Sequence, residues 1–404
     1  MTKFAAAALF AITIAAIAVM WESAFWATAL AEVALFCVAA FWIIAALIGV
    51  AELQTRFVLF PLAAAALWPL VQIVAGTTIY RWATAVSLLY WASAAALVFA
   101  GLQIFSDHAV RRGYLRALVV AGFIMAVVAP LQLFTSGGKI FWLFETPFAN
   151  VAMGPFLYGN QYAAFIELLL PVAMASLFTD RGGWRIFYGL AAAVMYASVF
   201  ASVSRTGFIL TTIEVLLVPL VAARRAGISF RQIAGPGVIF LAVLMVLGLA
   251  VGPERMIAKL QQKDPYAGRR EFAEAALPMI QDRPWMGVGL GNWSVAYPQY
   301  AIFDEGLLVN QAHNDWAQWT VEGGVPFVLF MLLVAVWSFR AAFRTIWGTG
   351  VLVVFFQCFV DYPIQRIAVA IVFFTLISAI AFPEVSSEAA HRRSGMRRKI
   401  DSAA

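Results

Sequence analysis

Three arginines and one histidine are the side chains in this sequence best suited to chemistry on an anionic group. Arg205 lies between two apolar stretches, Arg269 and Arg270 begin an amphipathic segment, and His313 precedes another apolar stretch. A guanidinium group matches phosphate oxygens with two parallel hydrogen bonds, so these arginines could hold a phosphate. A histidine can take a proton from a hydroxyl near neutral pH, and the neighbouring Asp315 would raise its basicity.

Each of these residues also has an ordinary structural explanation. Arg205 could be an interfacial arginine that extends its head group into water. The arginine pair could be solvated and balanced by Glu271 and Glu274, and His313 could simply be hydrogen-bonded. Residues 253–315 carry six Lys and Arg against eight Asp and Glu, a balance of −2. An anion site here would therefore have to be built from individual side chains.

Metal and nucleotide chemistry find little support in the sequence. The two cysteines, Cys37 and Cys358, lie in apolar stretches, and neither belongs to a Cys-x-x-Cys motif. With three histidines and no Asp-x-Asp pair, we expect no metal site and no cofactor. The glycine-rich run at 287–291 lacks the preceding strand and the later acid of a dinucleotide site, so it predicts a tight turn.

Three glutamates, Glu32, Glu167 and Glu214, fall inside long apolar stretches. A carboxyl group within a membrane is costly, so it should face the bundle interior or a watery cavity. Such residues are typical of proton-coupled transporters. They are equally compatible with protonated glutamates that are hydrogen-bonded inside a bundle.

The composition indicates what must position these side chains. Of the 404 residues, 63% are hydrophobic and 12% charged, whereas a soluble domain has about 25% charged residues. A soluble enzyme of this length is therefore excluded. The net charge of +6 is thin and scattered, which excludes a nucleic-acid-binding protein. We expect an all-α integral membrane protein whose residues 1–404 form a single membrane domain.

Apolar stretches of about 20 residues can cross a bilayer as helices. We expect a polytopic bundle of about twelve, at residues 4–20, 27–50, 57–75, 85–104, 115–134, 162–178, 186–203, 207–223, 236–252, 316–339, 347–360 and 367–382. The first stretch imitates a signal peptide. We interpret it as an uncleaved helix because the next apolar stretch follows almost at once.

Lysine and arginine residues predict the orientation, because they gather in cytoplasmic loops. With the N-terminus in the cytoplasm, 17 of the 27 basic residues fall in inner loops and in a basic tail at 384–404. Only four fall in short outer segments, and both termini are then cytoplasmic. The long loop at 253–315, between the ninth and tenth helices, lies outside and should carry part of an active site.

Several short motifs follow one another between about residues 150 and 365. They are Gly154-Pro155-Phe156-Leu157-Tyr158-Gly159-Asn160, Ser204-Arg205-Thr206-Gly207, Gly268-Arg269, Asp282-Arg283-Pro284-Trp285-Met286-Gly287, Ala312-His313-Asn314-Asp315, Glu322-Gly323-Gly324 and Asp361-Tyr362-Pro363. In order and spacing, this set resembles the O-antigen ligase and polymerase superfamily of bacterial envelope glycan transferases.

The resemblance implies a metal-independent glycosyltransferase in the bacterial inner membrane, with its active site on the periplasmic face. Its donor would be a glycan on undecaprenyl diphosphate, and its acceptor a sugar hydroxyl of the lipid A-core oligosaccharide. The reaction would invert the anomeric carbon. Membrane lipids would surround the protein, and nucleic acid would play no part.

The resemblance also implies roles for individual residues. By position, Arg205 and Arg269 would hold the diphosphate, and His313 would be the general base. Arg270 could take the place of Arg269, because the doubled arginine leaves the register open by one residue. Two arginines can stabilise the charge of a departing diphosphate without a metal. The supporting residues would be Asn160, Asn314 and Asp315.

Two other functions remain open at this point. A polymerase of the same superfamily would add the glycan to another repeat unit instead of to lipid A-core. The chain ends soon after the last expected helix, without a further domain, which favours the ligase. A transporter or flippase of lipid-linked sugars would also fit twelve helices, although the sequence shows no internal symmetry between halves.

Overall fold

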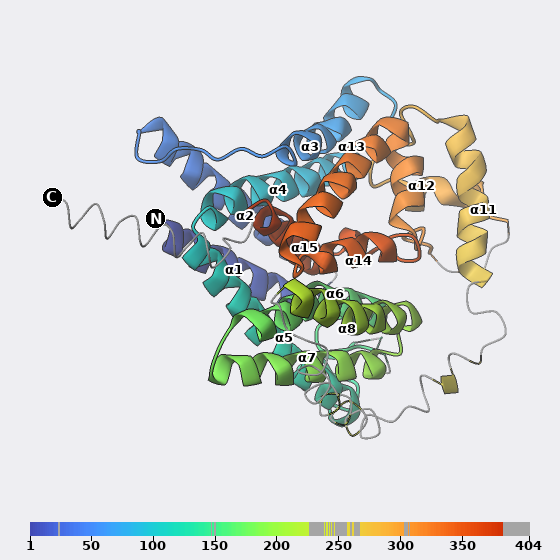
Figure 1. The fold of residues 1–404 in the computed structure, drawn as a ribbon. Helices are drawn as coiled ribbons and strands as arrows, with labels where there is room; N and C mark the ends of the chain where they lie inside the picture. Colours follow the sequence, from blue (N-terminus) through green and yellow to red (C-terminus); the bar gives the residue numbers. More distant parts are fainter. Residues whose placement is uncertain are drawn as a thin grey trace.

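The computed structural model describes residues 1–22, 25–146, 148, 151–225, 267–302, 306 and 308–382, with isolated positions between 238 and 261. Within these residues the chain is helical and has no β-strand, which confirms the predicted all-α bundle (Figure 1). The α-helices are α1 Thr2–Val19, α2 Phe25–Leu47, α3 Leu59–Val74, α4 Arg81–Phe105, α5 His108–Thr135, α6 Gly159–Thr179, α7 Gly183–Ser202, α8 Arg205–Arg225, α11 Ala267–Asp282, α12 Trp293–Ala296, α13 Asp315–Thr345, α14 Thr349–Gln357 and α15 Ile367–Ile380.

Eight of the described helices are long and apolar enough to cross a membrane, namely α1, α2, α4, α5, α6, α7, α8 and α13. Helices α3 and α15 are apolar but shorter. Helix α14 has nine residues and extends about 14 Å, less than half of the roughly 30 Å hydrocarbon core. Eleven of the twelve expected ranges therefore coincide with a described helix. The expected span at 236–252, apart from isolated positions, and the expected tail at 384–404 lie outside the described residues.

Helices α6 and α15 form the centre of the bundle. Residues 161–175 of α6 and 368–380 of α15 are all buried. An α-helix that is apolar on every side is stable when other helices surround it. A side-chain carbon on Gly350 of α14 would lie only 2.4 Å from the backbone oxygen of Glu167 in α6. The two backbones therefore approach each other as small residues allow.

Helix α13 is broken at Gly324, where φ is 68° and ψ is −174°. The turn at 287–291 lies against this break. The Val288 N–H donates to the Val321 carbonyl at 2.9 Å, which satisfies a backbone group that the break leaves free. At Gly287, φ is 63° and an added side-chain carbon would lie 2.3 Å from a backbone oxygen of α13. The glycines therefore serve a close contact between the outer segment and α13, a role beyond turn formation.

Helices α11 and α12 lie at the edge of the bundle, beside the first part of α13 (Figure 1). They bury a small apolar core of their own, separate from the core of the bundle. Its largest members are Met279, Val288, Trp293, Tyr297 and Val321. Because α11 carries Arg269, this small core holds a candidate site residue in a defined place relative to α13.

Candidate active site

The carboxylate of Asp361, in the segment between α14 and α15, joins three of the motifs. Its Oδ2 atom lies 3.6 Å from Nη2 of Arg269 in α11, and its Oδ1 atom lies 3.7 Å from Nδ1 of His313. The side-chain amide of Asn160, at the start of α6, donates a hydrogen bond to Oδ2. Residues that lie up to 201 positions apart in the chain thus meet at one acidic side chain.

Backbone hydrogen bonds hold Asp361 in place. Its Oδ1 accepts from the Tyr362 N–H at 2.9 Å, and its carbonyl accepts from the Asp315 N–H at 3.1 Å. The amide of Gln357, at the end of α14, donates to the Asn160 carbonyl at 3.1 Å. The segment is therefore hydrogen-bonded to the beginnings of both α6 and α13. The side chain of Asp361 is only 8% exposed.

The imidazole of His313 is held between aromatic rings. The Phe272 ring stacks on it, with a centroid distance of 5.8 Å and an interplanar angle of 17°. The Tyr362 ring meets it edge-on at 4.8 Å. The side chain is 37% exposed, and its buried Nδ1 atom lies 3.7 Å from Asp361 without a hydrogen bond. The backbone of His313 has φ of 52°, a left-handed conformation that few residues adopt.

Asn314 and Asp315 have structural positions beside the histidine. Asn314 caps α13, because its Oδ1 accepts from the Ala317 N–H at 3.0 Å. Asp315 is fully buried, and its Oδ2 accepts from the Ile364 N–H at 3.2 Å. The expectation from the sequence that Asp315 is the carboxylate next to His313 is wrong. The facing carboxylate belongs to Asp361, because the first turn of α13 directs Asp315 into the protein.

Arg205 is the first residue of α8 and lies at the same end of the bundle. Ser204 begins the helix, since its hydroxyl oxygen accepts from the Gly207 N–H at 3.1 Å. A side-chain carbon on Gly207 would lie 2.3 Å from that of Ala163, which follows Asn160 by one turn of α6. Arg205 thus adds a positive charge to a helix N-terminus, and both features attract anions.

The two neighbouring arginines of α11 have different surroundings in the structure. Arg269 is 25% exposed and reaches Asp361, whereas Arg270 is exposed on the helix surface. A fourth arginine, Arg366, which sequence reasoning did not select, donates to the Tyr362 hydroxyl at 3.2 Å. Burial raises the pKa of the nearby Tyr158 phenol, and Tyr362 adds to this effect.

A clamp of buried polar groups holds the outer segment against α13. The Glu322 carboxylate accepts from the N–H groups of Gly291 and Trp293, both at 2.9 Å, and from the Gln318 amide at 3.1 Å. The Gln318 oxygen accepts from the Ala312 N–H at 3.0 Å. The residue before His313 and the segment that follows α11 are therefore fixed to the same helix.

Asp361 and this clamp are the features that sequence reasoning missed. The Asp361-Tyr362-Pro363 motif contributed to the resemblance, but no role followed for its acid. A usable signal existed, because Asp361 is an acid in a short outer segment between two apolar stretches. In the predicted topology, that segment lies on the same side as Arg205 and His313.

The arrangement can do two things chemically. It places the imidazole of His313 beside the carboxylate of Asp361, so the histidine could accept a proton. It also places guanidinium groups where they could bind the anionic group of a substrate. Among the described residues, no three His, Cys, Asp or Glu side chains gather in a way that could hold a metal ion. The glutamates Glu32, Glu167 and Glu214 are buried within α2, α6 and α8.

Comparison with known protein families gives a match over part of the chain. Residues 190–332 match the family model described as O-antigen ligase, a region that runs from α7 into α13 and contains Arg205, Arg269 and His313. No curated protein matches the chain. Over residues 190–332 the chain is therefore similar to the O-antigen ligase family, and this match supports a glycan-processing membrane enzyme of the ligase and polymerase type.

Proposed function

We propose that this protein is a glycosyltransferase of the ligase type. It moves a glycan from undecaprenyl diphosphate to a sugar hydroxyl of the lipid A-core oligosaccharide. The observation that carries the proposal is the cluster in which His313 and Arg269 face one carboxylate, that of Asp361, at 3.7 and 3.6 Å. A candidate base and a candidate diphosphate ligand meet there, and both come from the region that matches the family.

In the proposed step, Nε2 of His313 takes the proton of the acceptor hydroxyl while the hydroxyl oxygen attacks the anomeric carbon. The bond from that carbon to the diphosphate oxygen breaks, and undecaprenyl diphosphate leaves with one more negative charge. Attack from the side opposite the leaving group inverts the anomeric carbon. A positioned base typically contributes about 10²–10⁴-fold to such a step.

The arginines stabilise the negative charge that develops on the leaving diphosphate. Arg269 lies 3.6 Å from Asp361, and a guanidinium has five N–H donors, so it can bind a diphosphate as well as this carboxylate. Arg205 approaches from the N-terminus of α8, and Arg270 is the alternative to Arg269. Because fixed positive charge stabilises a departing diphosphate directly, we expect transfer to continue in an excess of chelator. Activity that requires a divalent ion would contradict this mechanism.

We place the active site on the periplasmic face of the bacterial inner membrane, with both termini in the cytoplasm. The candidate residues support this placement, since they lie at the beginnings of α6, α8 and α13. The ion pairs of Arg112 and Arg116 with Asp180 join the beginning of α5 to the end of α6, at the opposite end of the bundle. That end carries the basic excess expected of a cytoplasmic face.

The test of this function is transfer by the purified full-length protein in lipid nanodiscs. The substrates are a glycan on undecaprenyl diphosphate and purified lipid A-core. We expect His313→Ala to lose at least about 100-fold in kcat. His108→Ala, which changes a histidine at the opposite end of the bundle, should transfer normally. Full activity of His313→Ala would remove the base from the proposal.

Deletion of the gene in its host separates the ligase from the other functions. A ligase deletion leaves lipid A-core without long chains while lipid-linked polymer accumulates. Lipid A-core that carries single repeat units would indicate a polymerase instead. Movement of lipid-linked sugar across reconstituted vesicles, with no covalent product, would indicate a transporter.

A further inference from the structure

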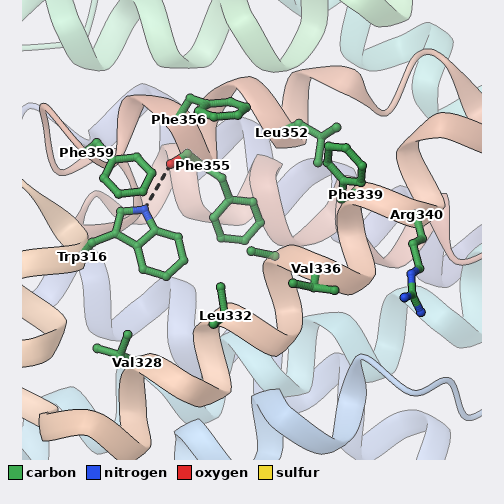
Figure 2. A pocket seen from close by; sticks show the side chains of 11 residues that line it. Trp316, Val328, Leu332, Val336, Phe339, Arg340, Leu352, Phe355, Phe356 and Phe359 are labelled. Atoms are coloured by element: carbon green, nitrogen blue, oxygen red, sulfur yellow. Dashed lines mark hydrogen bonds between the residues drawn. The ribbon is translucent and has the colours of Figure 1, made fainter.

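The segment between α14 and α15 has an apolar part and a polar part. In the apolar part, Phe359 lines an apolar groove of about 580 Å³ between α13 and α14 (Figure 2). Its ring stacks on that of Trp316 at 5.5 Å and 24°, and the Trp316 Nε1–H donates to the Phe355 carbonyl at 3.2 Å. Among the described residues that line the groove, only Arg340 is charged, and it lies far from Trp316. The charged side chains of the segment itself follow Phe359, within residues 361–366.

Arg366 ends this polar part and is attached to the aromatic neighbour of the candidate base. Its Nη2 donates to the Tyr362 hydroxyl at 3.2 Å, and its Cζ atom lies 5.1 Å from the centre of the Tyr362 ring. The same ring meets the imidazole of His313 at 4.8 Å. Because both groups contact one ring, the guanidinium lies within about 10 Å of the imidazole.

Arg366 has no acidic partner among the described residues, although it is partly buried. Its Nε atom is buried and makes no hydrogen bond to them. The two acids of the candidate site are engaged elsewhere, since Asp361 faces His313 and Asp315 accepts from the Ile364 N–H. A charge that is partly removed from water is costly unless an opposite charge accompanies it. The position therefore favours an anion that comes from outside the chain.

Two further features favour an anion at this place. Helix α15 begins directly after Arg366, and the N-terminus of a helix disfavours a cation and attracts an anion. The Tyr158 side chain is 38% exposed, and its hydroxyl donates to no described residue. Burial raises the pKa of this phenol, Tyr362 adds to the rise, and the charge of Arg366 lowers it. The phenol is therefore close enough to serve as a second donor.

The surroundings of Arg366 differ from those of the arginines proposed to hold the diphosphate. Arg205 and Arg269 come from α8 and α11, whereas Arg366 comes from the start of α15 and touches the ring that touches His313. In the proposed reaction, the hydroxyl at the base belongs to the acceptor. The groups of the acceptor that flank this hydroxyl therefore lie around His313.

We propose that Arg366 and Tyr158 bind an acidic group of the acceptor oligosaccharide, a phosphate or a carboxylate, an inference that rests on the proposed function. The acidic group lies on the sugar that carries the attacking hydroxyl or on the sugar next to it. This contact supplies the counter-ion that Arg366 lacks. It also makes the enzyme specific for acceptors that carry an acidic group near the attacking hydroxyl.

The first experiment measures transfer by the full-length protein in nanodiscs, with each substrate varied while the other saturates. We expect Arg366→Gln to raise the KM for lipid A-core by at least about tenfold, because hydrogen bonds to a charged group are lost. The KM for the donor should not change. Arg366→Lys should recover part of the loss, since it keeps the charge without the fork of donors. Arg81→Gln is the matched control, because Arg81 is an exposed arginine at the start of α4, and it should alter neither KM.

A positioning role for Arg366 would give a different result. Tyr362→Phe removes the hydroxyl that accepts from Arg366 and keeps the ring against His313. We expect the KM for lipid A-core to rise much less in this variant than in Arg366→Gln. Equal losses of kcat in the two variants, with an unchanged KM for lipid A-core, would overturn the proposal. A rise confined to the KM for the donor would also overturn it.

Chemically altered acceptors identify the acidic group. Lipid A-core is tested after removal of its phosphates and, in a separate sample, after amidation of its carboxyl groups. We expect one of these changes to raise the KM of the unaltered protein as much as Arg366→Gln does. The same change should add little in Arg366→Gln, because both perturbations remove one contact. Losses that add in full for both altered acceptors would overturn the proposal.

Binding of lipid A-core without donor separates this site from the proposed function. The unaltered protein, Arg366→Gln and Arg81→Gln are titrated in nanodiscs with lipid A-core alone. Binding that is weaker only in Arg366→Gln, in a protein that transfers no glycan, would support the acceptor contact and reject the transferase. Normal transfer with the same KM for lipid A-core in Arg366→Gln and Arg81→Gln would reject the acceptor contact and leave the transferase standing.

Discussion

Replacing Asp361 by asparagine removes the negative charge that faces His313 and Arg269, while it preserves the size of the side chain. The hydrogen bond from the Tyr362 N–H to Oδ1 survives, and so does the backbone bond from Asp315. The Asn160 amide, which donates to Oδ2, has to turn over so that its oxygen accepts from the new amide. The change therefore tests the charge at the centre of the site while the backbone contacts of the segment are kept.

The magnitude follows from the distance between the two groups. When His313 takes a proton, the ion pair at 3.7 Å is worth about 4.5 kcal/mol at an effective dielectric constant of about 20, and about 1 kcal/mol in water. Asp361 is 8% exposed but His313 is 37% exposed, so solvent screens part of the interaction. About 2 kcal/mol remains, which predicts a roughly 30-fold lower kcat for Asp361→Asn.

The assay is steady-state transfer with saturating acceptor and varied lipid-linked donor. We expect the loss in kcat, with a smaller change in KM, because the charge matters most when the histidine is protonated. Asp282→Asn is the matched control, since Asp282 is an exposed acid whose side chain accepts from Tyr300. A kcat of Asp361→Asn within threefold of the unaltered protein would refute the reasoning, as would a change confined to KM.

Three further predictions concern the arginine pair, the clamp and the helix contact below Arg205. Arg269→Lys should lower kcat/KM by about 10- to 100-fold, because lysine lacks the fork of donors; a loss of this size in Arg270→Lys, with normal activity in Arg269→Lys, would reverse the assignment. Glu322→Ala should lower the free energy of unfolding by about 3 kcal/mol or more, since three donors lose their acceptor; an unchanged denaturation midpoint would contradict the clamp. Gly159→Ala should abolish transfer, because its new carbon would lie 1.9 Å from a carbonyl oxygen at the end of α7. Gly268→Ala, which meets nothing within 4 Å, should transfer normally.

The sequence alone determined the membrane class and most of the helices. A bilayer requires long apolar helices, and each such helix can be recognised as one continuous apolar stretch of the sequence. Eleven expected ranges coincide with helices for that reason. The sequence predicted the lengths of the helices less well than their positions. Helix α14 lies in the apolar stretch expected at 347–360 but ends at Gln357 after nine residues. Its short length depends on how the chain turns back toward Asp361.

The sequence also singled out Arg205, Arg269 and His313 as candidates, since their residue types are rare and their motifs are short and ordered. It could not tell which acid faces the histidine. Asp315 is two residues from His313 in the chain, but the helical turn that begins α13 directs it into the core. Asp361 is 48 positions away and arrives only because α14 returns the chain to the same end of the bundle.

The contacts between distant segments were decided by the tertiary structure alone. Glu322 meets the N–H groups of Gly291 and Trp293 because α13 breaks at Gly324 and the glycine turn packs against the break. The groove beside Trp316 likewise requires α13 and α14 to lie side by side. Such pairings depend on which faces pack together, and apolar periodicity in a membrane helix does not specify them, because lipid and protein neighbours are equally apolar.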